Sequence, residues 1–192
     1  MTTPSFWDEI FCVVHGWASH VVIHEAAHAV FAVNHGIPIR EVRIEPPAGF
    51  LGLVDGKRIV AGGVTIEGDP SVWIPARGET ALDFLVIGRV AEIGFFQHAL
   101  PNSDAGDLAL WKSATGWEAT TEQIDASRER MRLEVEASEN AILALAHEFR
   151  RSLNVNEGGS YTGFDEALII AGADVVRIVE LAQTPRADGR LK

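Results

Sequence analysis

The sequence predicts a single α+β domain over residues 1–192, mostly helical, with a small β-sheet next to its first long helix. Two observations carry this prediction. Long apolar segments rich in helix formers, such as 18–35 and 79–100, have the length of buried helices. Between residues 39 and 68 the pattern changes to short, partly alternating apolar runs separated by glycine and proline, which is typical of strands and turns.

The amino-acid composition argues against some kinds of binding partner and favours one kind of cellular compartment. The formal net charge of −11 speaks against nucleic acid or an anionic membrane surface as the main partner, because both require clustered lysine and arginine. A single cysteine, Cys12, excludes an intramolecular disulfide and favours a reducing compartment. Asp8 and Glu9 stand where a signal peptide would be basic, and no apolar run approaches the length of a membrane span. We therefore expect a soluble, cytoplasmic protein with no membrane partner.

The helix over 18–35 contains the motif His24-Glu25-Ala-Ala-His28, an HExxH sequence. In a helix the two histidines lie one turn apart on the same face, so that their ring nitrogens can bind one Zn²⁺ ion. Glu25 then lies beside the metal, where it can accept a proton from a water molecule. Because the helix is strongly apolar, two ordinary histidines and a glutamate would be costly to bury there without a metal or a polar network.

Shorter elements surround this helix. Residues 4–15 predict a short amphipathic helix within an N-terminal extension over 1–15. Strands are expected at 39–45, 50–54 and 58–68, with a hairpin at Asp55-Gly56 and a weakness or bulge at Gly62-Gly63.

The second half of the chain is predicted to be helical. A loop at 69–78 leads into helices at 79–100 and 104–116, the second with acidic residues in its first turn. Thr120 and Gln123 resemble a capping box that opens a long amphipathic helix over 121–152. One or two short helices are expected over 164–182, followed by a frayed tail at 184–192.

Two histidines do not complete a catalytic zinc site, which ordinarily has three protein ligands. No third histidine follows at the spacing of the longer HExxHxxGxxH motif. Three carboxylates remain as candidates. Glu92 stands in the middle of an apolar helix, where it is either a ligand or a partner that orients one, and Asp104 and Asp107 stand at a helix start, where capping is the simpler explanation.

The segment HEAAHAVFAVNHGIPIREVRIEP, followed by GFLGLV, resembles the peptidase domain of FtsH-type zinc proteases. The segments LVIGRVAEIGFF and NSDAGDLALWKSA resemble two further segments of that family, and the resemblance extends over most of residues 18–170. It implies a zincin-like fold in which His24, His28 and Asp107 hold the zinc and Glu25 is the catalytic base. It also implies peptide substrates, for which we expect docking as an added strand at an edge near Gly52 and Leu53.

The chain departs from the family at several points. Ala27 replaces the usual glycine of the motif, and the sequence contains neither a membrane anchor nor a GxxxxGK[ST] phosphate loop. The expected activity is thus an ATP-independent endopeptidase that cuts unstructured polypeptides.

Two alternatives stay open at this point: a non-catalytic zinc-containing binding or regulatory module with the same fold, and a hydrolase of a non-peptide amide. The sequence also leaves open whether the chain acts as a homo-oligomer or with a partner protein.

Overall fold

The computed structural model describes residues 17–45, 53–54, 57–58, 61–152 and 167–184. Within these ranges the chain forms six helices and five strands, so the α+β, mostly helical class is confirmed. The helices are α2 (Trp17–Asn34), α3 (Pro70–Arg77), α4 (Glu79–Phe96), α5 (Ala105–Thr115), α6 (Thr121–Ser152) and α7 (Gly172–Gln183). The strands are β1 (Ile39–Glu45), β2 (Leu53–Val54), β3 (Lys57–Arg58), β4 (Ala61–Ile66) and β5 (Leu168–Ala171). The predicted N-terminal helix, N-terminal extension and most of the frayed tail lie outside the described residues.

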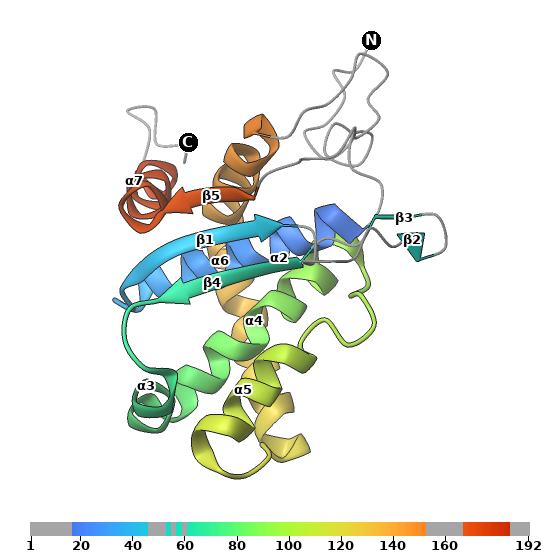
Figure 1. Ribbon diagram of the computed structural model, residues 1–192, viewed down its shortest axis with the longest axis vertical. Coiled ribbons are helices and arrows are strands. Elements are labelled where there is room, and N and C mark those ends of the chain that lie inside the picture. The colour runs from blue at the N-terminus through green and yellow to red at the C-terminus, as the bar shows by residue number, and fades with distance from the viewer. Residues whose placement is uncertain (1–16, 46–52, 55–56, 59–60, 153–166, 185–192) are drawn as a thin grey trace.

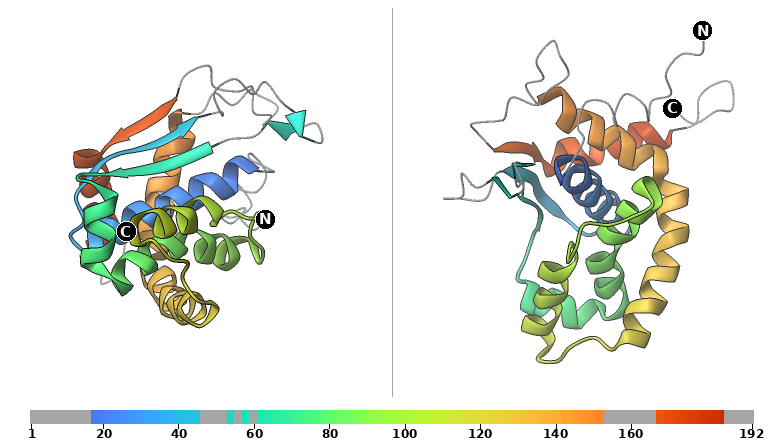
Figure 2. Two further views of the ribbon diagram at one scale, coloured as in Figure 1. Left: turned by 60° about the horizontal axis from the view of Figure 1, so that its bottom comes forward. Right: turned by 90° about the vertical axis from the view of Figure 1, so that its right-hand side faces the viewer.

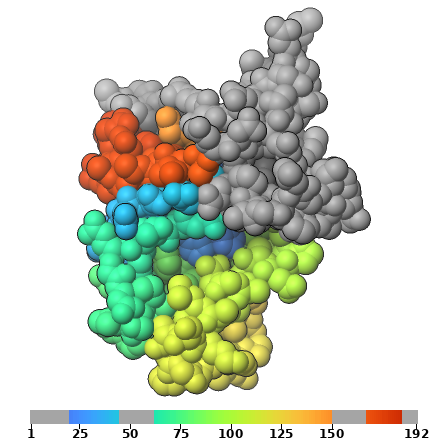
Figure 3. Space-filling view, in the orientation of Figure 1, coloured from blue at the N-terminus to red at the C-terminus, as the bar shows by residue number. Residues whose placement is uncertain are grey.

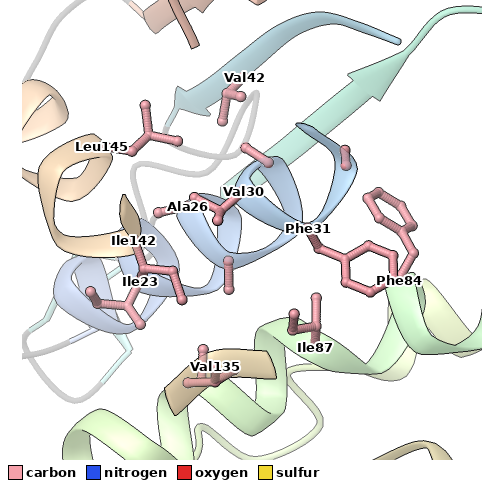
Figure 4. Close-up of a cluster of buried hydrophobic side chains, with 14 of the residues drawn as sticks. Ile23, Ala26, Val30, Phe31, Val42, Phe84, Ile87, Val135, Ile142 and Leu145 are labelled. Atoms are coloured by element: carbon pink, nitrogen blue, oxygen red, sulfur yellow. The ribbon is translucent and has the colours of Figure 1, made fainter. Parts of the chain in front are cut away.

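Helix α2 lies at the centre of the fold, covered by the sheet on one side and by α4 and α6 on others (Figures 1 and 2). Four alanines of α2, all fully buried, let these neighbours approach closely: Ala26, Ala27, Ala29 and Ala32. Larger apolar side chains fill the remaining space. Figure 4 shows Val30 of α2 near Val42 of β1, and Phe31 beside Phe84 of α4. Such packing fixes α2, and with it the HExxH motif, against several elements at once.

The main sheet has the strand order β4-β1-β5, with both neighbours antiparallel to β1. Val42 and Ile44 of β1 face the core, whereas the alternation breaks toward Ile39. A β-bulge between Ile39 and Glu41 accounts for this break, since one extra residue returns Ile39 to the buried face. The imperfect alternation in the sequence thus marks a bulge within a continuous strand.

Two predictions of local structure are wrong, and a third is wrong in part. Residues 70–77 form helix α3 where a loop was expected: Asp69 caps it by accepting a hydrogen bond from the Ser71 amide at 2.8 Å, and Pro70 occupies the first turn. Residues 168–171 form strand β5 where a helix was expected, because this short apolar run pairs with β1. The expected strand over 58–68 is also divided between β3, which pairs with β2, and β4, which joins the main sheet.

The remaining helices agree with the sequence pattern within a few residues at their ends. At the start of α6, the Thr120 amide donates to the Gln123 side chain at 2.9 Å and the Gln123 amide donates to the Thr120 hydroxyl at 3.2 Å. These reciprocal bonds confirm the capping box. Among the helices described, none is long and apolar enough to cross a membrane.

Candidate metal centre

Three side chains from two helices bring their ligand atoms together. Helix α2 contributes His24 and His28 one turn apart, and the first turn of α5 contributes Asp107. The Nε2 atoms of the two histidines are 3.0 Å apart, and Asp107 Oδ2 lies 3.3 Å from Nε2 of His24 and 3.7 Å from Nε2 of His28. This group could hold a metal ion. Of the three carboxylates that the sequence left open, Asp107 is the one that joins both histidines.

The donor set fits a tetrahedral metal. With metal–ligand bonds of 2.0–2.1 Å, neighbouring ligand atoms of a tetrahedral zinc site lie about 3.3 Å apart. The three observed separations of 3.0, 3.3 and 3.7 Å bracket this value. The Nδ1 atom of His24 donates to Glu92, so the neutral ring keeps the lone pair on Nε2, which faces the other two ligand atoms.

Glu92 of α4 orients the ring of His24. Its side chain is only 1% exposed, and its Oε1 accepts a hydrogen bond from His24 Nδ1 at 2.8 Å. The other oxygen accepts from His20 Nδ1 at 2.9 Å and from the Leu100 amide at 2.8 Å. Burial opposes ionisation, but the bonds from His20, His24 and Leu100 prevail and lower the pKa of Glu92 to about 2. The carboxylate is therefore charged, and both of its oxygens accept hydrogen bonds beside the ligand set.

Proton and metal compete for the same place. Burial opposes the charged ring of His24, yet hydrogen bonds to Asp107 and Glu92 outweigh it and raise the pKa of His24 to about 10. Burial likewise opposes ionisation of Asp107, but His28 and His24 hold the pKa of this carboxyl well below its usual range. His24 Nε2 lies 3.0 Å from His28 Nε2 and 3.3 Å from Asp107 Oδ2, so a metal that binds here must displace any proton held among these three atoms.

Glu25 lies next to the ligand set without a hydrogen-bond partner among the described residues. The residue is 7% exposed. Burial raises the pKa of Glu25, and the nearby carboxylates of Asp107 and Glu92 add to this, while His24 and His28 oppose it. A buried carboxylate with raised pKa and free lone pairs is suited to accept a proton.

Two glycines make room for the motif, a role that no local sequence pattern predicts. A Cβ atom at Gly88 of α4 would lie 2.4 Å from His24 Nε2, and a Cβ atom at Gly62 of β4 would lie 2.4 Å from Glu25 Cγ. At separations this short, either the added side chain or the residue of the motif would have to shift. Gly62 was expected to weaken or bulge a strand; in the structure it allows β4 to pass directly over Glu25.

Asp104 lies outside the ligand set. Its carboxylate accepts a 2.6 Å bond from Arg128 of α6 and lies 3.7 Å from Arg89 of α4. Arg89 also donates to the Leu100 carbonyl and the Ser103 hydroxyl. These contacts fix the segment that precedes α5, and so the position of Asp107. No sequence pattern predicts this role for either arginine.

The surface is hollowed at the site. Figure 3 shows a depression between β4 and α5, with α2 at its floor. Strand β4 borders it and pairs only with β1 within the described sheet, which leaves its other edge toward the depression. Leu53, for which substrate docking was predicted, lies in β2 and pairs with β3, and Gly52 lies outside the described residues.

Comparison with known proteins adds no assignment: no family model matches the chain, and no curated protein matches its sequence.

Proposed function

We propose that the protein is a zinc-dependent metallopeptidase of the FtsH type with a zincin-like fold, in which His24, His28 and Asp107 bind the metal and Glu25 is the general base. The observation that carries this proposal is the combination of a three-atom ligand set with tetrahedral spacing and an adjacent buried carboxylate that has no other described partner. A purely structural metal site has no use for such a carboxylate, so this observation favours an enzyme over a binding module.

Each residue has a distinct part in the proposed reaction. When bound, zinc supplies the Lewis acid that polarises the scissile carbonyl and lowers the pKa of a water molecule. Glu25 accepts the proton of the attacking water and delivers it to the leaving amine, a transfer that its raised pKa assists. Glu92 holds the His24 ring so that Nε2 stays aimed at the ligand set.

The free edge of β4 is the proposed docking site for an extended peptide. A peptide that pairs with β4 would lie in the depression between β4 and α5, beside Gly62 and therefore beside Glu25. This proposal moves the docking edge from Gly52 and Leu53 to β4. N-methylation at alternate backbone nitrogens removes the N–H groups that would pair with β4. Such peptides should therefore be cut more slowly than the same peptides without methylation, and equal rates would rule out strand pairing.

The decisive experiment is digestion of an unstructured peptide library by zinc-loaded wild-type protein and its Glu25→Gln variant. The variant should keep zinc, since Glu25 is not a ligand, while its rate falls by roughly 10²–10⁴-fold, the contribution typical of a general base. Glu180→Gln, an exposed position on α7, is the matched control and should retain full activity. The same polypeptide in a stably folded form should resist cleavage.

Two other results of this digestion would each support a different function. A wild-type protein that holds zinc but cleaves no peptide faster than Glu25→Gln would instead be a non-catalytic metal-containing module. Cleavage of simple amides but not of peptides would indicate a hydrolase of another amide class.

A further inference from the structure

A second pair of histidines lies outside the ligand set. The rings of His20 on α2 and His98, just after the end of α4, have centroids 4.9 Å apart and are tilted by 56°. The His24–His28 pair has nearly the same arrangement, with a centroid separation of 4.7 Å and a tilt of 55°. The two histidine pairs thus have nearly equal ring separation and tilt, although only one of them belongs to the proposed catalytic centre.

Hydrogen bonds fix the tautomer of both rings of the second pair. The Nδ1 atom of His20 lies 2.9 Å from Glu92 Oε2, and the Nδ1 atom of His98 lies 2.8 Å from the Phe96 carbonyl. Both partners only accept, so each Nδ1 must carry the proton. In the neutral rings each Nε2 therefore keeps its lone pair, and no hydrogen bond from the described residues occupies either Nε2.

We propose that His20 and His98 form a second binding site for a divalent transition metal, with Nε2 of each ring as a ligand and water completing the coordination. Two imidazoles on one tetrahedral ion, bound at 2.0–2.1 Å, have ring centroids about 5 Å apart, close to the observed 4.9 Å. Imidazole ligands suit Zn²⁺, Ni²⁺ and Cu²⁺, and not Mg²⁺ or Ca²⁺.

The environment of the pair favours binding over a purely structural role. His20 is buried and held by Glu92 and by ring contact with Phe96 at 4.2 Å, so one ligand is fixed in advance. His98 is exposed, which gives a metal access from solvent. A hydrogen bond from Nδ1 to a carboxylate or a backbone carbonyl is also the usual support of a metal-binding histidine. With two protein ligands in place of three, this site should bind more weakly than the first.

The test is a calorimetric titration of Ni²⁺ into protein loaded with one equivalent of zinc, with zinc retention checked by elemental analysis. Wild type should bind one Ni²⁺ per chain, and His98→Gln should lose this binding while keeping its zinc. His35→Gln is the control, because His35 is another exposed histidine, at the end of α2, and should leave the nickel binding unchanged.

A further variant separates this site from the proposed catalytic one. Metal-free His28→Ala should lose tight zinc binding and still bind Ni²⁺ at the second pair, with nitrogen couplings from two imidazoles in the spectrum of Cu²⁺ bound there. Absence of nickel binding in wild type, or equal binding by His98→Gln, would overturn the second site whatever the fate of the first.

Discussion

Replacing Gly88 by alanine should strongly weaken metal binding, although none of the proposed ligands is replaced. The new Cβ atom would lie 2.4, 2.5 and 2.6 Å from Nε2, Cδ2 and Cε1 of His24. To reach the separation of about 3.5 Å at which such atoms pack, the ring must move by about 1 Å. Metal–ligand distances tolerate only about 0.2 Å. Because the shift also strains the bond to Glu92, zinc affinity should fall by more than the roughly 10–100-fold that loss of an orienting partner typically causes.

The same helix provides the matched control. Gly94→Ala places its Cβ atom 3.6 Å from Val135 Cγ1, an ordinary contact, so metal affinity should be unchanged. The Gly94→Ala protein should be more stable than wild type by up to about 1 kcal/mol, because alanine favours the helix. Gly88→Ala has the same gain in helix propensity, but overpacking against His24 costs about 1–3 kcal/mol. Competition with a chromogenic chelator gives the affinities, and thermal denaturation of the metal-free proteins gives the stabilities. Equal zinc affinity of the two variants would refute the close approach of α4 to His24.

Further predictions concern Glu25, Asp107 and Glu92. Gly62→Ala should displace Glu25 and reduce peptide hydrolysis while zinc content stays at one per chain. Gly63→Ala, whose Cβ has no atom of the described residues within 4 Å, should match wild type in the same assay, and equal loss in both variants would contradict the contact. Asp107→Asn should weaken zinc more than Glu92→Gln, which should cost roughly 10–100-fold in a chelator competition; the reverse order would make Glu92 the ligand. The metal-free protein should lose stability as pH falls from about 4.5 toward 2, because unfolded Glu92 takes up a proton at a higher pH than folded Glu92. The free energy of unfolding that this group contributes, and that is lost over this pH range, is on the order of 3 kcal/mol. Denaturant titrations of Glu92→Gln should not show this loss. If the stability of the variant fell equally with pH, another group would be responsible.

Features that depend on neighbours in sequence were predictable. The HExxH helix, the capping box at Thr120 and the long helix α6 all follow from spacings within a few residues, and the structure contains them. Helix α3 was missed although Asp69-Pro70 is a local start signal, because the helix has only eight residues and no clear apolar period. The mistaken helix at 168–171 has another cause: a four-residue apolar run has no period of its own, and it became a strand by pairing Ile170 with Val42.

In the candidate site, too, some residues follow from sequence spacing, whereas others are brought together only by the tertiary structure. By itself the sequence determined the two histidines and the glutamate of α2, since helical geometry places positions i and i+4 on one face. It offered Glu92, Asp104 and Asp107 as carboxylates without ranking them by distance, and only a resemblance singled out Asp107. Tertiary structure distinguishes the three by position, because α5 brings Asp107 to both histidines, α4 places Glu92 against His24 Nδ1, and arginines of α4 and α6 pair with Asp104. The roles of Gly62 and Gly88 also depend on the tertiary structure. The absence of a side chain matters at these positions only because α2 places Glu25 and His24 against them.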